Sequence, residues 1–254
     1  QVFVNPKEHL PEPLAQKIGK TLAAKWTKLP DERRALLKLI SRFEITNDQA
    51  KLLYVQEVRS GAGIAETDAE IIANPYLLYE LTRLTADPVS IWTVDRGVFP
   101  DDVVRQAHPL PEPSALDAGT DARRVRALTV SCLEGAATAG NSLLPQDQLV
   151  LKIRELPLQP SCDVDADLLA VAKEGFGDVV VEVPMANGEP ALKLGRLVEM
   201  GEVIRAAVTK RVAGKRLVVT ADWRRLLDEH LGQAATGDEL EEQARTEKTV
   251  ALKE

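Results

Sequence analysis

The chain has 254 residues, of which 44% are hydrophobic and 28% are charged, and its formal net charge at pH 7 is −7. This composition is ordinary for a globular protein and allows one large or two to three small domains. Affinity for a phosphate backbone comes largely from Lys and Arg side chains that release counterions. The acidic balance therefore argues against strong nucleic-acid binding by the isolated chain, so any contact with DNA must be local.

Residue usage indicates a mainly α, cytoplasmic protein. Aromatic residues make up only 4% of the chain, whereas the helix formers Ala, Leu, Glu and Arg are plentiful. Cys132 and Cys162 are the only cysteines, too few and too far apart for a zinc site, and we expect reduced thiols. We see no leader and no apolar run near the ~18 residues that span a bilayer, so we expect no membrane contact. The first residue is Gln1 and not Met, which suggests a piece of a longer protein.

Residues 1–104 are predicted to form a small helical domain. Helix formers fill residues 14–28, and Pro30 with Asp31 begins a second helix. The apolar side chains of this second helix recur at helical spacing, at Leu36, Leu37, Ile40 and Phe43. Two capping boxes then predict helix starts near Asn47 and Asp68, namely Thr46 with Gln49 and Thr67 with Glu70. Short helices joined by tight turns favour a helix-hairpin-helix-like domain.

Gly61, Ala62 and Gly63 lie between the two capping boxes. In a helix-hairpin-helix element, the bare backbone N–H groups of such a hairpin face a DNA phosphate. Two glycines one residue apart also occur in many ordinary turns between helices. Gly61 and Gly63 are therefore candidate DNA-backbone contacts, with an ordinary turn as the alternative.

Residues 105–120 are the predicted linker between two domains. They contain Pro109, Pro111 and Pro113, and each proline pushes the residue ahead of it out of the helical region. A helix is then expected to begin at Asp121. We therefore place a domain boundary in this proline-rich segment.

Residues 121–216 are predicted to form a winged-helix-like module with a trailing helix. The first helix starts at Asp121 and ends at Gly140 and Asn141, the second has Pro145 in its first turn, and the third covers about 164–173. Their inward-facing residues are expected to be Val125, Leu128, Cys132, Ala136, Leu149 and Ile153. A longer amphipathic helix is predicted over residues 197–212, and residues 217–254 are expected to be helical.

A β-hairpin is the clearest local pattern of this module. Apolar residues alternate with other residues in both strands, and Asn187 with Gly188 predicts a type I′ turn between them. We expect the apolar residues to share one face over the helices: Val179, Val181, Val183, Leu192 and Leu194. Beneath them, Leu128, Cys132, Leu149, Ile153, Leu168 and Leu169 are expected to be buried. An unpaired charge at position 181 should then unfold the module.

The charges of the module favour protein docking over reading of DNA bases. The third helix of a winged-helix DNA reader lies in the major groove and needs positive or amide side chains. Here a lone Lys173 faces four acids: Asp163, Asp165, Asp167 and Glu174. A basic cluster occurs only later, and it is either a solvated helix end or a DNA-backbone contact. Its residues are Arg205, Lys210, Arg211, Lys215 and Arg216.

No catalytic, cofactor or metal site is predicted. Gly19, Lys20 and Thr21 end like a phosphate-binding loop, but the glycine required five positions before Gly19 is Leu14. The three histidines are too scattered for a metal site or a triad: His9, His108 and His230. The three tryptophans are too dispersed for a base-stacking platform, and we interpret them as core or interface anchors: Trp26, Trp92 and Trp223.

The segment from Asn74 to Asp101 is a specific string with no reactive chemistry of its own. Asn74, Pro75 and Tyr76 start a helix, and Thr93-Val94-Asp95-Arg96 follows. This segment resembles the region ahead of the motor domains in bacterial RecD-like DNA helicases, superfamily 1 relatives of the exonuclease V α subunit. The likeness covers roughly residues 30–254. The chain departs from the family at residues 89–93, because relatives usually have a glycine-rich hairpin there.

The resemblance implies that this chain is a non-catalytic N-terminal accessory region, and that residues 217–254 lead into an absent ATPase domain. The complete protein would use ATP and Mg²⁺ to unwind DNA in recombination or repair. The contact of this region with DNA would be weak and would be made as part of the complete protein. No ATP-contacting residue can be carried over to Gln243 or Lys248. The alternative is a stand-alone winged-helix adaptor or regulator with a protein partner at the acidic third helix.

Overall fold

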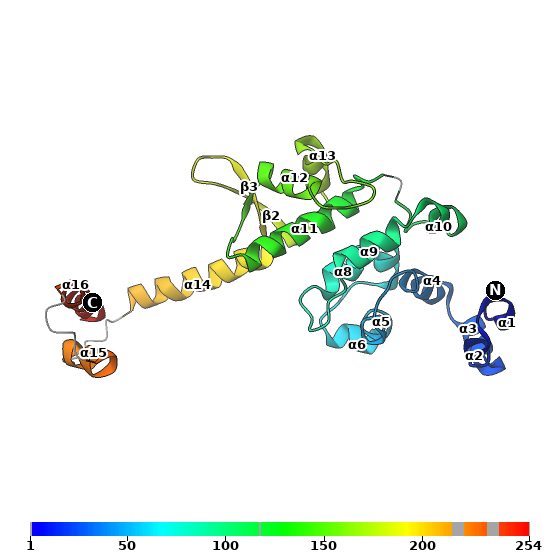
Figure 1. The fold of residues 1–254 in the computed structure, drawn as a ribbon, viewed down its shortest axis with the longest axis horizontal. Helices are drawn as coiled ribbons and strands as arrows, with labels where there is room; N and C mark the ends of the chain where they lie inside the picture. Colours follow the sequence, from blue (N-terminus) through cyan, green and yellow to red (C-terminus); the bar gives the residue numbers. More distant parts are fainter. Residues whose placement is uncertain (1, 117, 215–220, 233–238, 254) are drawn as a thin grey trace. The chain divides into compact units, whose positions relative to one another are not determined.

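The computed structural model describes residues 2–116, 118–214, 221–232 and 239–253 (Figure 1). The chain divides into two compact units, Gln1–Met200 and Gly201–Glu254. The described residues are mostly helical and contain a three-stranded antiparallel sheet. This confirms the predicted mainly α class with a β-hairpin.

Short helices build the first part of the first unit. They are α1 (Pro6–His9), α2 (Glu12–Ala15), α3 (Lys20–Lys28), α4 (Asp31–Ile40), α5 (Asn47–Tyr54), α6 (Gln56–Gly61), α7 (Asp68–Ala73), α8 (Leu77–Thr82), α9 (Ile91–Val98) and α10 (Asp102–Ala107). Both predicted capping boxes are present, because the hydroxyl oxygens of Thr46 and Thr67 accept backbone N–H groups at the starts of α5 and α7. The core of this domain includes the buried Leu36, Leu53, Ile71, Leu78 and Val94.

The second part of the first unit has the winged-helix order of elements. It runs through α11 (Ala122–Thr138), β1 (Leu144–Pro145), α12 (Gln146–Arg154), α13 (Ala166–Lys173), the 3-10 helix η1 (Gly177–Val179), β2 (Val180–Pro184) and β3 (Pro190–Leu194). The strand order of the sheet is β1-β3-β2. The three predicted helices and the two-stranded wing are confirmed. Strand β1, in which Leu144 pairs with Leu192, was not predicted. Pro145 lies directly before α12 as its N-cap.

Local signals set both ends of α11. The Asp121 carboxylate accepts the N–H of Arg123 at 2.9 Å at the start of the helix. At the other end, the Gly140 N–H donates to Ala137 O and the Asn141 N–H to Ala136 O, at 3.0 and 2.9 Å. With φ of 88° at Gly140, this is a Schellman cap, which needs a left-handed residue that glycine adopts without strain.

The turn of the wing differs from the type I′ prediction. In the described residues of the loop only Gly188 has positive φ, at 84°, whereas a type I′ turn needs positive φ at two central residues. The Gly188 N–H donates to Met185 O at 2.9 Å, and the Met185 N–H donates to Glu189 O at 2.8 Å. The loop is therefore the three-residue kind, a type I turn followed by a left-handed glycine.

The predicted inner face of the wing is also wrong. Val180 lies opposite Leu194, and Glu182 lies opposite Leu192, so these residues share one face. Val181 and Val183 point to the other face and are half-buried, because the strand begins at 180 and side chains alternate. Val180 is the buried valine of β2.

Most of the predicted helical core is confirmed. Leu128, Leu149, Ile153 and Leu169 are buried, as are Val125 and Ala136. Leu168 is 39% exposed, because neighbouring positions on a short helix cannot both face the core. Cys132 is half-buried.

The predicted linker packs against the helical domain. Residues 102–107 form α10, and Ser114 is buried with its hydroxyl donating to Ile72 O at 2.6 Å. The Arg123 guanidinium donates to Ala73 O and Ala115 O, at 2.7 Å in each case. These bonds hold the proline-rich segment to the end of α7 and the start of α11.

Helix α14 (Gly195–Ala213) begins in the first unit, and the second unit also contains α15 (Trp223–Leu231) and α16 (Glu239–Lys253). The surface of α14 carries exposed apolar side chains, among them Val203, Ile204, Val208 and Val212. In the part of the chain that the structure describes, no helix has the length and apolarity needed to cross a membrane.

Candidate functional site

The two halves of the Asn74–Asp101 segment meet in the interior of the first unit. The Asn74 side-chain oxygen accepts the N–H of Tyr76 at 3.1 Å, which fixes the turn that leads into α8. Tyr76 is fully buried, and its hydroxyl donates to Asp95 Oδ1 on α9 at 2.6 Å. Burial, reinforced by the Asp95 charge, raises the pKa of Tyr76. The phenol therefore stays protonated and remains a hydrogen-bond donor.

Arg124 of α11 completes this buried cluster. Its Nε and Nη2 donate to the two Asp95 carboxylate oxygens, each at 2.8 Å, in the bidentate geometry that suits guanidinium and carboxylate. Its other N–H groups donate to Gly119 O at 2.9 Å and Pro160 O at 2.8 Å. Burial acts to lower the pKa of Arg124. The hydrogen bonds and the negative charge of Asp95, with smaller contributions from Tyr76 and Cys162, act in the opposite direction, and the pKa of Arg124 is raised overall. The cluster of Tyr76, Asp95 and Arg124 joins the helical domain to the winged-helix module.

A cleft of about 790 Å³ lies at this joint. One wall comes from α9, α10 and their connection, and the other from the loop between α12 and α13. The lining residues are Trp92, Asp95, Arg96, Phe99, Pro100, Asp101, Asp102, Val104, Arg105, Pro157, Leu158, Gln159 and Pro160. The Asn74–Asp101 segment thus supplies two of the three residues of the buried cluster and much of the cleft wall.

The charges in the cleft are close to balanced. Asp95 is neutralised by Arg124 behind it, and the Asp102 carboxylate accepts from Arg105 at 2.8 Å. The Arg96 guanidinium is 3.7 Å from the Glu44 carboxylate, and both side chains are largely exposed. Such an exposed pair contributes little, so Arg96 can readily exchange Glu44 for another anion.

The predicted glycine contacts lie in a helix cap. The N–H groups of Ala62, Gly63 and Ile64 donate to Val58 O, Ser60 O and Arg59 O, at 3.0, 3.0 and 3.1 Å. Gly63 has φ of 77°, so the turn is a Schellman cap of α6. Because these three amides already donate within the turn, they are not free to bind a phosphate. The candidate role of Gly61 and Gly63 as DNA-backbone contacts stays a prediction, and this hydrogen bonding does not support it.

The predicted basic cluster lies on α14 where it is described. Arg205, Lys210 and Arg211 are exposed there, and Arg205 pairs with Glu202. Lys215 and Arg216 lie outside the described residues. The acids of the winged-helix module are exposed, as expected: Asp163, Asp165, Asp167 and Glu174. The module's Lys173 is held by Gln146 and Glu182.

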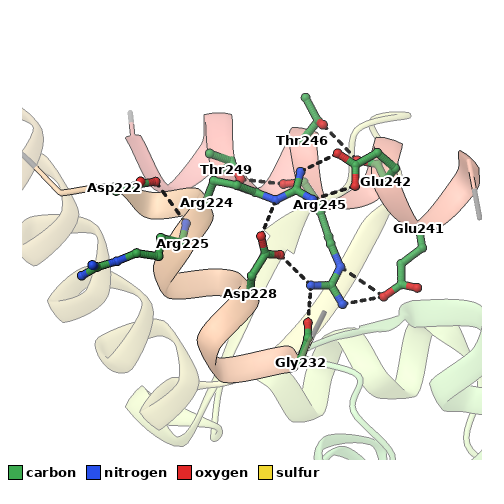
Figure 2. A network of polar contacts seen from close by, with 10 residues as sticks. All are labelled: Asp222, Arg224, Arg225, Asp228, Gly232, Glu241, Glu242, Arg245, Thr246 and Thr249. Carbon is green, nitrogen blue, oxygen red and sulfur yellow. Dashed lines mark hydrogen bonds and ion pairs between the residues drawn. The ribbon is translucent and has the colours of Figure 1, made fainter. Parts of the chain in front are cut away.

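Figure 2 shows a second polar cluster, between α15 and α16 in the second unit. The Arg245 side chain is 5% exposed and donates to Asp228 at 2.7 Å and to Gly232 O at 2.6 Å. Arg224 binds both oxygens of Glu242, at 2.8 and 2.6 Å. Hydrogen bonds from Arg224 and Arg245 hold the pKa of Asp228 below its usual range. Both arginines form ion pairs with carboxylates, so the cluster has a structural role in holding α15 against α16.

The sequence pattern did not reveal the whole of the buried cluster. It singled out the segment that contains Tyr76 and Asp95, but nothing in the pattern identified Arg124, 29 residues after Asp95, as their partner. Trp92 was interpreted as a core or interface anchor; it lines the cleft and is 40% exposed, so it is not a core residue, and the interface role stays a prediction. Among the described residues, no group of His, Cys, Asp and Glu is placed to hold a metal ion.

Comparison of the chain with known protein families, with curated proteins and with solved structures finds no match in any of the three. The expected resemblance to RecD-like helicases is therefore untested by these comparisons, and it depends on the Asn74–Asp101 segment and on the order of the elements after it.

Proposed function

We propose that this chain is the non-catalytic N-terminal accessory region of an ATP-dependent DNA helicase of the RecD type, which acts in recombination or repair. The observation that supports this function is the buried cluster of Tyr76, Asp95 and Arg124. The segment that resembles the family supplies two members of the cluster. The resemblance thus falls on residues with a physical task, which is to fix one module against the other.

A rigid joint suits a region that positions DNA or protein partners for a motor. A fully buried bidentate ion pair holds its two elements in one orientation, because rotation would leave both charges unpaired in the interior. Binding at one module would then be transmitted to the other as a rigid-body displacement. ATP and Mg²⁺ would be used by the motor and not by this region. Gly19 caps the start of α3 and belongs to no phosphate-binding loop.

The first test is the coding sequence that follows codon 254. A strand followed by GxxxxGK[ST], the loop that wraps nucleotide phosphates, is the expected result. The second test is ATP hydrolysis by the purified proteins. We expect DNA-stimulated hydrolysis by the complete gene product and none by residues 1–254. A stop codon after residue 254, or hydrolysis by this chain alone, would contradict the proposal.

A further experiment examines the joint in the complete gene product. Asp95→Asn should impair duplex unwinding more than ATP hydrolysis stimulated by single-stranded DNA, because positioning is lost while the motor is intact. Asp48→Asn, at the exposed pair with Lys51, is the matched control and should change neither activity. Equal loss of both activities in Asp95→Asn would argue against a positioning role.

The alternative function is a stand-alone winged-helix adaptor or regulator. It is favoured by the exposed surface of α13, which presents Asp167 beside the apolar Leu168 and Val171, 39% and 65% exposed. Such a mixture is more suited to a protein partner than to the phosphates of a major groove. A gene that ends at codon 254, with no motor domain, would select this alternative.

A further inference from the structure

Trp92 stands apart from the other aromatic side chains. Among the Phe, Tyr and Trp residues that the structure describes, Trp92 alone is exposed, and the others are buried or half-buried. Its neighbours on α9 face the core, since Ile91, Val94 and Val98 are buried. An indole at the wall of a cleft is a large apolar surface with a π face, and exposing it to water is unfavourable.

A guanidinium lies one helical turn beyond this indole. Arg96 follows Trp92 at the i,i+4 spacing that places two side chains on the same face of a helix, and its side chain is 72% exposed. Arg105 lines the same cleft from α10, and Asp102 offsets its charge. Asp101 also lines the cleft and is exposed. The cleft therefore combines one aromatic plane with one weakly engaged cation, a second cation paired with Asp102, and one further carboxylate that opposes phosphate binding.

The floor of the cleft is rigid. Asp95 is one of its lining residues and is held by Tyr76 and Arg124. The Arg124 guanidinium also lies over the Phe99 ring, 4.6 Å from its centroid. Pro157 and Pro160 stiffen the opposite wall. A pre-formed site binds with a smaller loss of conformational entropy than a flexible one, which matters most for a weak ligand.

We propose that this cleft binds single-stranded nucleic acid, with one base stacked on Trp92 and an adjacent phosphate bound by Arg96. Every base has a π face, and stacking on an aromatic side chain does not depend on sequence. A strand carries a phosphate beside every base, which matches an aromatic plane with a guanidinium next to it. This inference rests on the proposed function, because it assigns a strand-contacting site to the accessory region.

The acidic charge of the protein limits the affinity. The cleft itself is nearly neutral, so stacking must contribute more than ion release. We expect a dissociation constant for (dT)15 on the order of 1–100 µM at low salt, the range of non-specific contacts. With one or two phosphates bound, the logarithm of the affinity should fall with the logarithm of the salt concentration with a slope of about −0.7 to −1.4.

The experiment uses the 254-residue chain with Trp26→Phe and Trp223→Phe, which leaves Trp92 as the only indole. Titration with (dT)15 should quench its fluorescence. In anisotropy titrations with labelled (dT)15, Trp92→Ala should weaken binding about tenfold, equivalent to about 1.4 kcal/mol, and Trp92→Phe should retain part of the affinity. Trp26→Ala, which removes an indole stacked on Phe3, is the matched control and should leave the affinity unchanged.

An abasic strand of the same length separates stacking from phosphate binding. Trp92→Ala should have little effect on binding of this strand, because it offers no base. Arg96→Gln should reduce the salt slope for (dT)15 by about 0.7. Absence of quenching up to about 100 µM strand, or equal binding of (dT)15 by the Trp92→Ala variant, would overturn the proposal and favour a protein segment as the occupant.

Failure of this inference and failure of the proposed function give different results. If a motor domain follows codon 254 but Trp92→Ala binds (dT)15 like the parent chain, the accessory function stands and the cleft assignment is wrong. If Trp92 contributes to strand binding but no motor domain follows, the cleft assignment stands and the helicase function is wrong.

Discussion

Removal of the Asp95 charge should be one of the most destabilising conservative changes in the chain. Asp95→Asn keeps the shape of the side chain but leaves the guanidinium of Arg124, whose side chain is 0% exposed, without a carboxylate. The amide would keep one acceptor oxygen, and Gly119 O and Pro160 O would still accept from Arg124, but the buried positive charge would lose its counter-charge and one acceptor. Breaking a buried ion pair on one side costs about 3–5 kcal/mol, a large share of the ~5–15 kcal/mol that a domain has.

Two further variants separate the terms of this cost. Tyr76→Phe removes a hydrogen bond to a charged acceptor but leaves the ion pair intact, so it should cost about 1.5–3 kcal/mol. The double variant Asp95→Leu with Arg124→Met removes both charges together. It should be less destabilising than Asp95→Asn, because no buried charge is left unpaired.

The assay is urea unfolding followed by circular dichroism, and the single variants Asp95→Leu and Arg124→Met complete a double-mutant cycle with the double variant. Lys51→Ala is the matched control, since it removes an exposed ion pair with Asp48 that should contribute less than ~1 kcal/mol. If Asp95→Asn costs less than about 1 kcal/mol, or if the double variant is worse than the single one, the cluster is not the joint that we describe.

Three other predictions concern the wing, a thiol and a buried carboxyl. Val180→Asp should unfold the winged-helix module, whereas Val181→Asp should be tolerated with a loss below about 2 kcal/mol; thermal unfolding of both variants checks the assigned face. Burial raises the pKa of Cys132 to about 11, so about one thiol in a thousand is ionised at pH 8, and a thiol reagent should modify it far more slowly in the folded than in the unfolded chain. Burial also raises the pKa of Glu80, despite its ion pair with Arg126. The folded state then holds this proton more tightly than the unfolded state, so Glu80 lowers stability as pH rises above its ordinary pKa. Glu80→Gln should gain stability relative to the parent chain between pH 4 and 7; a pH-independent difference in denaturant midpoints would refute this.

Local signals predicted most of the secondary structure. The capping boxes at Thr46 and Thr67 act within a single turn of helix, and the glycine that ends α11 acts in the same way, so the pattern contains the whole physical cause. Strand β1 was missed because its two residues have no periodicity, and they are strand only through their pairing with Leu192 and Ala191. The predicted face of the wing was wrong because residues 179–183 read Val-Val-Val-Glu-Val, so a valine is available for either face, and only the pairing with β3 shows that Val180 is the inner one.

The candidate site was harder to predict because its parts are distant in sequence. Tyr76, Asp95 and Arg124 are brought together only when α8, α9 and α11 pack, and an arginine on a helix surface cannot be told from a buried one by composition. Trp92 lines the same cleft as Pro157 and Pro160, which are more than 60 residues later in the sequence. No periodicity encodes such a contact.

The specificity of the Asn74–Asp101 segment now has a physical explanation. Each of its unusual residues meets a geometric demand: Asn74 fixes the turn into α8, and the Ser90 hydroxyl oxygen accepts the Trp92 N–H at 3.2 Å to begin α9. Gly97 has no side chain because a β-carbon there would collide with the Phe43 ring. Substitution at any of these positions would move α9, and with it both the buried carboxylate of Asp95 and the exposed indole beside it. One short helix, α9, therefore carries both the carboxylate of the buried cluster and the exposed indole of the cleft, although its segment has no reactive chemistry of its own.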